Sequence, residues 1–375
     1  MPTAKPTASP SPVPTPGLFR APVVLDQAML PIVVADFDGD GNLDIAGGAA
    51  DARVQLLLGV GDGRFQPGAE MPGGNGPASI GAADFNGDGR LDIVMAYSGV
   101  SDQGTGDDDI LVFLAKDDGS FEALVQPAGV NPQALVVGDF NEDEVPDLAT
   151  ANGFDYLSIF AGLGDGTFAD PENYPINARF ASGIAAADFD GDGNLDLVTT
   201  NSMIGKGRSD RTMSVLLGAG DGTFGEPQTF PVSGPQPIMP VVGDFNGDGF
   251  ADVASPDGYP TRVTSVLLGL GNGALRETSY YLCGPNPHTL ATADLDGDGI
   301  LDLVCGNAGE EGGPVGKGIA ALFGLGDGTF KPGVDLVGNQ FGEGIAAAAD
   351  LDNDGQIDLI VYSDTLVVLF NDIPR

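Results

Sequence analysis

The stretch ADFDGDGNLDIAGG (residues 35–48) places aspartates at positions 36, 38, 40 and 44 and a glycine at position 41. Asp and Gly also build ordinary turns, because Asp side chains accept hydrogen bonds from the nearby backbone and Gly adopts positive φ. Turn formation explains one or two of these aspartates, but not four carboxylates that repel one another within nine residues. Ca²⁺ does explain them, because it binds about six to eight carboxylate and carbonyl oxygens. The stretch therefore predicts a calcium-binding loop.

The same nine-residue loop occurs seven times, at 36–44, 84–92, 139–147, 188–196, 244–252, 294–302 and 350–358, named loops 1 to 7 in chain order. We expect the side chains of loop positions 1, 3, 5 and 9 and the carbonyl of position 7 to hold one Ca²⁺ in each loop. The predicted ligands, loop by loop, are Asp36, Asp38, Asp40, Asn42, Asp44; Asp84, Asn86, Asp88, Arg90, Asp92; Asp139, Asn141, Asp143, Val145, Asp147; Asp188, Asp190, Asp192, Asn194, Asp196; Asp244, Asn246, Asp248, Phe250, Asp252; Asp294, Asp296, Asp298, Ile300, Asp302; and Asp350, Asp352, Asp354, Gln356, Asp358.

The seven loops differ in ligand charge and in backbone fitness. Loops 2, 3 and 5 carry Asn at position 3, which keeps an oxygen ligand but lowers the charge. Loop 3 departs most, because Glu144 replaces the glycine of position 6 and Pro146 follows at position 8. A left-handed conformation costs a non-glycine residue about 1 kcal/mol or more. We expect loop 3 to be the weakest of up to seven structural Ca²⁺ sites. No loop is an EF-hand, since position 12 of the first copy is Gly47 rather than Glu.

The composition fits this interpretation and excludes several classes of partner. The chain has 375 residues, 54 Asp and Glu against 15 Lys and Arg, and a formal net charge of −39. Nucleic acid and anionic membrane surfaces require a basic footprint, so neither is an expected partner. At 42% hydrophobic residues the chain can build a core, and it contains no apolar run long enough to span a membrane.

The N-terminal sixteen residues, MPTAKPTASPSPVPTP, are rich in Pro, Thr and Ser and have no apolar signal region. We expect residues 1–16 to form a disordered linker to a membrane anchor or a neighbouring domain, followed by one domain over 17–375.

A second motif, the Gly-rich turn GLGDGTF or a variant of it, follows six of the loops, at 59–65, 115–121, 162–168, 218–224, 269–275 and 324–330. Asp-Gly or Asn-Gly between apolar runs is a strong hairpin signal. Each unit then contains four short strands, for example 183–187, 195–200, 213–218 and 224–230. Four strands repeated about every fifty residues predict an all-β, seven-bladed propeller. The seventh unit lacks its fourth strand, and PGLFRAP (16–22) resembles DGTFGEP (221–227), so we expect residues 18–26 to complete the last blade and close the ring.

These two repeated motifs resemble the FG-GAP/VCBS repeat, the blade of the integrin α-subunit head, over residues 18 to about 372. The resemblance implies seven blades with calcium on the bottom face. Proteins of this architecture include adhesion receptors, fungal and bacterial lectins and a few sugar-converting enzymes. The resemblance therefore indicates the fold and the calcium loops far more specifically than the function.

The top face, opposite the calcium loops, is the expected ligand face. The connections between second and third strands lie there and differ in length from blade to blade, with the longest in blades 2, 4 and 6, whereas the rest of each unit keeps a nearly constant length. Of the long connections, SDQGTGDDD (101–109) is acidic and GKGRSDR (205–211) is basic. The basic residues of 205–211 could form an anion-binding patch, or they could pair with nearby acidic residues. Phe154 and Tyr362 are further aromatic residues expected near this face. The candidate ligand-binding residues are Tyr97, Tyr156, Arg179, Lys206, Arg208, Arg211, Tyr259, Arg262 and His288.

Catalysis has little support in the sequence. His288 is the only histidine, so no His-based metal centre and no Ser-His-Asp triad can be argued. Cys283 and Cys305 flank the first two strands of blade 6, where a disulfide is one of two open possibilities and would fit an extracytoplasmic location. We expect a secreted or surface-tethered, monomeric, calcium-stabilised propeller that binds carbohydrate or mediates adhesion. The alternatives are a protein-interaction module without sugar affinity and a saccharide-modifying enzyme.

Overall fold

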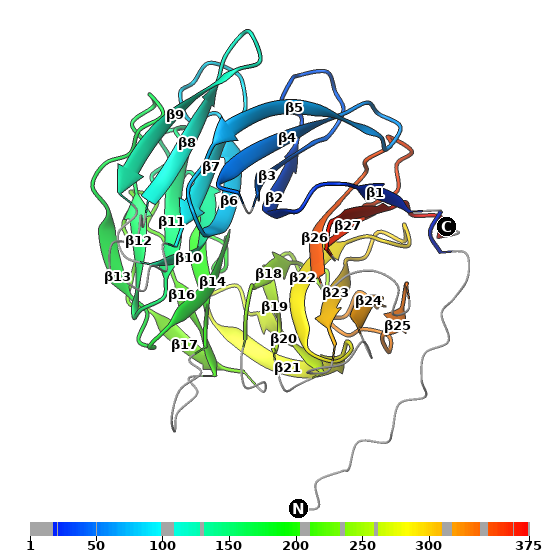
Figure 1. Ribbon diagram of the computed structural model, residues 1–375. Helices are drawn as coiled ribbons and strands as arrows, with labels where there is room; N and C mark the ends of the chain where they lie inside the picture. The colour runs from blue at the N-terminus through cyan, green and yellow to red at the C-terminus, as the bar shows by residue number, and fades with distance from the viewer. Residues whose placement is uncertain are drawn as a thin grey trace, which may run out of the picture.

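The computed structural model describes residues 18–20, 22–49, 51–98, 109–127, 131–202, 211–232, 237–258, 262–309, 317–337, 344–362 and 364–373. These residues form seven four-stranded antiparallel sheets arranged as a ring around a central axis (Figure 1). The fold class predicted from the repeats is therefore confirmed. Within the described part of the chain all regular structure is β-strand, and no helix there could cross a membrane.

Each blade uses four strands in chain order, except the last. Blades 1 to 4 comprise β2 (Met29–Ala35), β3 (Asp44–Ala49), β4 (Arg53–Gly59), β5 (Phe65–Pro72); β6 (Pro77–Ala83), β7 (Asp92–Tyr97), β8 (Asp109–Ala115), β9 (Phe121–Pro127); β10 (Pro132–Gly138), β11 (Asp147–Asn152), β12 (Tyr156–Phe160), β13 (Glu172–Pro175); and β14 (Ala181–Ala187), β15 (Asp196–Asn201), β16 (Thr212–Leu216), β17 (Gln228–Pro231). Blades 5 to 7 comprise β18 (Val241–Gly243), β19 (Asp252–Pro256), β20 (Val263–Gly269), β21 (Leu275–Leu282); β22 (Pro287–Ala293), β23 (Asp302–Ala308), β24 (Lys317–Leu322), β25 (Val334–Asp335); and β26 (Gly344–Ala349), β27 (Asp358–Tyr362), β28 (Leu366–Leu369), β1 (Val23–Leu25).

The N-terminal strand closes the ring, as expected. β1 pairs antiparallel with β28, with Val24 opposite Val367. The contact continues beyond the strand, because Arg20 N–H donates to the Phe370 carbonyl (2.9 Å) and Asp372 N–H donates to the Leu18 carbonyl (2.8 Å). Closure pairs the outer edge of β28 with a strand of the same chain. The predicted linker, residues 1–16, lies outside the described residues.

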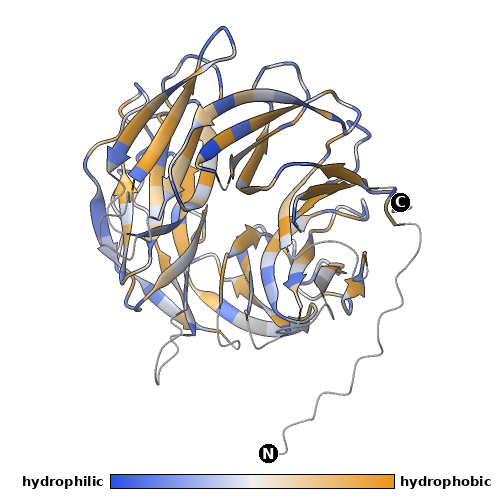
Figure 2. Ribbon diagram, viewed as in Figure 1, coloured by the Kyte–Doolittle hydropathy of each residue, from blue (hydrophilic) through white to orange (hydrophobic). Residues whose placement is uncertain are grey.

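The innermost strands carry small residues because the blades converge at the axis. A Cβ atom at Gly81 of β6 would lie 2.8 Å from a methyl carbon of Val137 in β10 of the next blade. The second strand of each blade is almost entirely buried, and in β7, β11 and β15 all six residues are buried. Figure 2 shows the hydrophobic residues concentrated along the strands. The core therefore lies between neighbouring sheets, in seven apolar clusters.

One strand prediction needs correction. The fourth strand of blade 4 was placed at 224–230, but β17 covers Gln228–Pro231. Phe224 makes only an isolated bridge with Gly218, and Gly225 N–H donates to the Leu217 carbonyl (2.8 Å). Pro227 has no N–H to donate, so ladder pairing resumes only after it.

Candidate metal loops and the opposite face

The seven aspartate loops lie on one face of the ring, because each connects the first strand of a blade to the second. The Gly-rich turns connect third to fourth strands and therefore lie on the same face. We call it the loop face. The turns between second and third strands and the crossovers between blades form the opposite face, as the sequence predicts.

The position-9 aspartate of every loop is buried and ties two segments of its blade together. In blade 4, Asp196 Oδ2 accepts the N–H of Phe189 (2.8 Å) and Oδ1 accepts the N–H of Gly218 (2.7 Å). In every other blade the position-9 aspartate likewise accepts two backbone N–H groups. One comes from the second residue of the loop, and the other from the first residue of the Gly-rich turn or, in blade 7, from Asn371. The position-9 aspartate thus has a structural role before any ion is considered.

Burial raises the pKa of these carboxyls, and the nearby aspartates of the loop raise it further, while the two N–H donors oppose the shift. The pKa rises to about 6 at five of the positions, namely Asp92, Asp196, Asp252, Asp302 and Asp358. Asp44 and Asp147 shift in the same direction for the same reasons. A buried negative charge of this kind is stabilised by a bound cation.

The remaining aspartates shape the loop backbone. In loop 4, Asp188 accepts the N–H groups of Gly191 (2.6 Å) and Gly193 (3.0 Å), and Asp192 accepts that of Asn194 (2.8 Å). These hydrogen bonds are the ones by which Asp side chains stabilise turns. Each carboxylate oxygen has a second lone pair that can still bind a cation. The loop is therefore folded around its carboxylates while these remain able to bind a cation.

Two observations show that the loop geometry fits a divalent ion. Four loops bring one oxygen from each of three aspartates within 4.8 Å of one another, the greatest spacing expected for oxygens bound to one Ca²⁺ at about 2.4 Å. Oδ1 of Asp296 and Oδ1 of Asp352 are also buried without a hydrogen-bond donor. A buried carboxylate oxygen without a partner is costly, and an ion would satisfy it. The four clusters are Asp36, Asp38, Asp40; Asp188, Asp190, Asp196; Asp294, Asp296, Asp302; and Asp350, Asp352, Asp358.

Loop 3 keeps the shared backbone conformation despite its sequence. Glu144 adopts φ of +68° and Glu142 adopts +58°, where most other loops have glycine. Glu144 N–H still donates to Asp139 Oδ2 (2.8 Å). Two glutamates in the left-handed conformation strain the loop. We therefore still predict that loop 3 binds calcium most weakly of the seven.

Arg20 gives loop 7 a feature that the sequence motifs do not predict. Its guanidinium contacts Asp352 and Asp354 (3.5 Å to the latter) and lies 5.0 Å from the centre of the Phe370 ring. The Asp352 side chain is only 7% exposed. Arg20 precedes the ring-closing strand, so two carboxylates that are predicted metal ligands in loop 7 also hold the N-terminal segment.

The raised pKa values predict the pH dependence of the metal-free protein. An aspartate with a folded-state pKa of about 6 and an unfolded value near 3.9 binds its proton more tightly when folded. Its stabilising contribution is complete below the unfolded pKa and disappears as the pH rises through about 6. The melting temperature in EDTA should therefore fall between pH 5 and pH 7. A Ca²⁺ titration at both pH values provides the comparison, because calcium should stabilise more at pH 7, where the carboxylates are ionised. A metal-free melting temperature that rises over this interval would contradict the assignment.

The opposite face brings together only some of the candidate ligand-binding residues. Tyr97 is 1% exposed and lies beneath the crossover at Gly73–Gly74, so its ring is not open to a ligand. Phe154 and Tyr156 stack at the β11–β12 turn, with ring centres 6.3 Å apart and planes at 12°. The crossover that carries Arg179 is bonded to the same turn, because Ala181 N–H donates to the Phe154 carbonyl (3.0 Å).

The other candidates are dispersed. Arg211, Arg262 and His288 are exposed, on blades 4, 5 and 6 respectively. Tyr362 ends β27 and is half-buried. Lys206, Arg208 and Tyr259 lie outside the described residues, as does most of each long loop at 101–109 and 205–211.

Cys283 and Cys305 form a disulfide with Cα atoms 6.2 Å apart. Cys283 directly follows β21 of blade 5, and Cys305 lies in β23 of blade 6. The bond thus links the crossover between two blades to the second of them, and it answers the question that the sequence left open.

Two models of one repeat family match this chain. A model described as "FG-GAP-like repeat" matches residues 32–95, 139–199 and 204–255, and one described as "FG-GAP repeat" matches 286–323. Together they cover parts of blades 1 to 6. A search of curated protein sequences finds no match.

Solved structures with little sequence identity share the fold. BBS1N, solved in complex with ARL6DN, is 13% identical with a TM-score of 0.63, covering 97% of this chain and 98% of that one. Sqt1 of Saccharomyces cerevisiae is 13% identical with a TM-score of 0.59, covering 96% and 100%. A lectin of Agrocybe aegerita that recognises non-reducing terminal N-acetylglucosamine is 21% identical with a TM-score of 0.53, covering 84% and 81%. The repeat models, the seven aspartate loops and the closed ring of four-stranded blades agree: the chain belongs to the FG-GAP repeat family of seven-bladed β-propellers.

Proposed function

We propose that this protein is a calcium-stabilised, extracytoplasmic propeller that binds carbohydrate through the face opposite its metal loops. The observation that carries the binding role is the stacked pair of Phe154 and Tyr156, which stands on that face beside the crossover of Arg179. Phe154 is 43% exposed although it is a large apolar residue. Exposed aromatic rings that are held rigidly are good anchors for a ligand.

Carbohydrate suits this pair because a sugar ring has an apolar face of C–H groups and an edge of hydroxyls. The aromatic rings offer the apolar contact, and the exposed guanidinium of Arg179 offers hydrogen-bond donors to hydroxyl or carboxylate oxygens. The lectin of similar fold supports the plausibility of sugar binding on such a ring, without assigning it to this chain.

Calcium has a structural role in this proposal. Each ion would hold a loop whose position-9 aspartate already connects to the Gly-rich turn of the same blade, or to Asn371 in blade 7, so each ion would stabilise one blade. Two features support an extracytoplasmic location. Disulfides persist in oxidising compartments, and the high calcium concentration outside cells fills even calcium loops of low affinity.

The test is an array of neutral and acidic glycans probed with Ca²⁺ and again with EDTA. We expect binding to a defined set of glycans in Ca²⁺, and at least a ten-fold loss in the Phe154→Ala/Tyr156→Ala double variant. Tyr280→Ala is the matched control, because Tyr280 is a 64% exposed aromatic residue on the outer strand of blade 5. A blank array with folded, calcium-loaded protein would contradict carbohydrate binding and favour the protein-interaction alternative.

A further inference from the structure

Neighbouring blades are held together on the loop face by a recurrent hydrogen bond. In blades 3 to 6 the third glycine of the Gly-rich turn, at the fifth position of the motif, donates its N–H to the carbonyl of loop position 2 in the preceding blade. The neighbouring blades approach closely there: a Cβ at Gly166 would lie 2.7 Å from a methyl carbon of Leu114 in the preceding blade. The four bonds are Gly166 to Phe85 (3.0 Å), Gly222 to Phe140 (2.9 Å), Gly273 to Phe189 (3.0 Å) and Gly328 to Phe245 (3.0 Å).

The turn of blade 2 (AKDDGSF, residues 115–121) does not make this bond. Its glycine, Gly119, donates instead to the Lys116 carbonyl of its own turn (2.9 Å). A Cβ at Gly119 would meet nothing within 4 Å, so blade 1 does not approach this glycine closely.

One residue distinguishes the turn of blade 2 from the turns of blades 3 to 6. The third position of the motif is glycine with positive φ in the turns of blades 1, 3, 4, 5 and 6, for example +74° at Gly164. The turn of blade 1 has this glycine, but its Gly63 packs against the Phe370 ring of blade 7 instead of making the hydrogen bond between blades. In blade 2 the third position is Asp117, which does not adopt positive φ, a conformation that L-residues avoid. The turn therefore closes on itself and stands away from blade 1.

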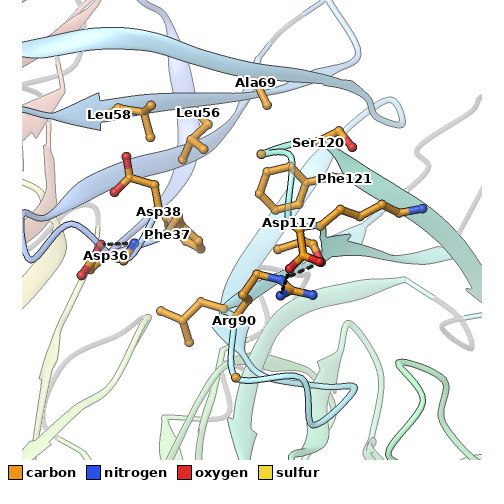
Figure 3. Close-up of a pocket in the computed structure, with 16 residues that line it drawn as sticks. Asp36, Phe37, Asp38, Leu56, Leu58, Ala69, Arg90, Asp117, Ser120 and Phe121 are labelled. Carbon is orange, nitrogen blue, oxygen red and sulfur yellow. Dashed lines mark hydrogen bonds and ion pairs between the residues drawn. The ribbon is translucent and has the colours of Figure 1, made fainter.

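The result is a cavity of about 610 Å³ between blades 1 and 2 on the loop face. Figure 3 shows Leu56 and Leu58 of β4 on one side of it and Phe121 at the start of β9 on the other. The polar residues at its rim include Asp38 of loop 1, Arg90 of loop 2, and Lys116, Asp117 and Ser120 of the blade 2 turn. Its volume lies within the range of about 300–1,000 Å³ that is usual for small-molecule sites.

The cations at the rim are paired with carboxylates. Arg90 donates to Asp117 Oδ1 (2.5 Å), to Asp88 Oδ2 (2.6 Å) and, more weakly, to the Ala115 carbonyl (3.3 Å). Lys116 pairs with Glu122 (2.6 Å). Both cations at the rim are thus balanced by carboxylates, which disfavours an anion. The combination instead suits an uncharged molecule with one apolar face and many hydroxyls.

We propose that this cavity is a second binding site, which takes one or two sugar rings. The apolar face of the sugar would lie against Phe121 and Leu58, with hydroxyls directed to Arg90, Asp117 and Ser120. The ligand class rests on the proposed function, but the site does not: it lies on the opposite face of the ring from Phe154 and Tyr156 and is formed by different blades.

The test restores the shared turn. Asp117→Gly should allow the Gly119 N–H to bond to the Phe37 carbonyl and so close the cavity. Ala69→Trp should fill the cavity from β5 without changing the turn. This variant tests the cavity even if the turn of Asp117→Gly keeps its present conformation. Asp170→Gly, on an exposed segment of blade 3, is the control for the lost charge and the added backbone freedom.

The probe is an array of neutral mono- and disaccharides. We expect wild type and Asp170→Gly to bind the same set of sugars. Asp117→Gly and Ala69→Trp should bind a subset of these sugars at least ten-fold more weakly. The Phe154→Ala/Tyr156→Ala variant should bind that subset as tightly as wild type does. If the two cavity variants bind every sugar as wild type does, the cavity is not a sugar site, while the proposed function stands. A blank array with wild type would overturn both. Slower hydrogen exchange of the Gly119 amide in Asp117→Gly would support the turn account, and unchanged exchange would contradict it.

Discussion

Removal of calcium is expected to lower the melting temperature of this protein by more than about 10 °C. An ion that binds only the folded state at about 100 times its dissociation constant adds about 2.7 kcal/mol of stability. Four such sites, the number of loops whose three aspartates already converge, would add about 11 kcal/mol. A chain of 375 residues has an unfolding entropy near 0.8 kcal/mol/K, so the shift is about 14 °C.

The measurement is a thermal melt of calcium-loaded protein and of protein treated with EDTA, with the metal content of each determined by elemental analysis. Re-addition of Ca²⁺ should restore the higher melting temperature. Mg²⁺ should restore much less, because it requires a smaller octahedral site and retains its waters. Coincident melts of a calcium-loaded and a verified metal-free sample would exclude a structural role for calcium.

The second large effect is expected for Asp196→Ala, which should reduce the free energy of unfolding by about 2–6 kcal/mol. The substitution leaves two buried backbone donors without an acceptor, the N–H groups of Phe189 and Gly218, and each costs about 1–3 kcal/mol. Because neither bond involves an ion, most of this loss should persist in EDTA. Denaturant unfolding with and without calcium measures both values.

Two comparison variants separate the roles of the loop aspartates. Asp190→Asn removes a charge at position 3 of the same loop and keeps an oxygen, so it should destabilise only when calcium is present. Asp170→Ala removes an exposed aspartate outside the loops and should change little. Equal effects of Asp196→Ala and Asp190→Asn in EDTA would show that the bridge to the Gly-rich turn is not the main role of Asp196.

The blade architecture could be predicted because it repeats. Four strands per unit follow from the alternation of apolar segments with aspartate loops and Gly-rich turns, and seven repetitions of one pattern outweigh the ambiguity of each short strand. Ring closure was also predictable, because the missing fourth strand of blade 7 has a counterpart around Phe19. The conformation of Glu144 followed from its place in a loop that elsewhere has glycine.

Features that depend on contacts between distant segments were not predictable in the same way. The burial of Tyr97 results from the crossover at Gly73–Gly74, which no local pattern reports. Arg20 reaches loop 7 only because the ring closes. The cavity had a signal in the sequence, Asp117 in place of glycine, but its effect depends on the hydrogen bond between blades that the turns of blades 3 to 6 make.

The measurement that tests the central claim most directly is the number of calcium ions bound per chain. Protein dialysed against micromolar free Ca²⁺ and then against millimolar free Ca²⁺ would be analysed for bound calcium by elemental analysis. We predict several ions per chain at the lower concentration and up to seven at the higher one, with an Asp143→Asn variant of loop 3 affecting only the last to bind. A chain that binds no calcium at millimolar concentration while remaining folded would contradict the account.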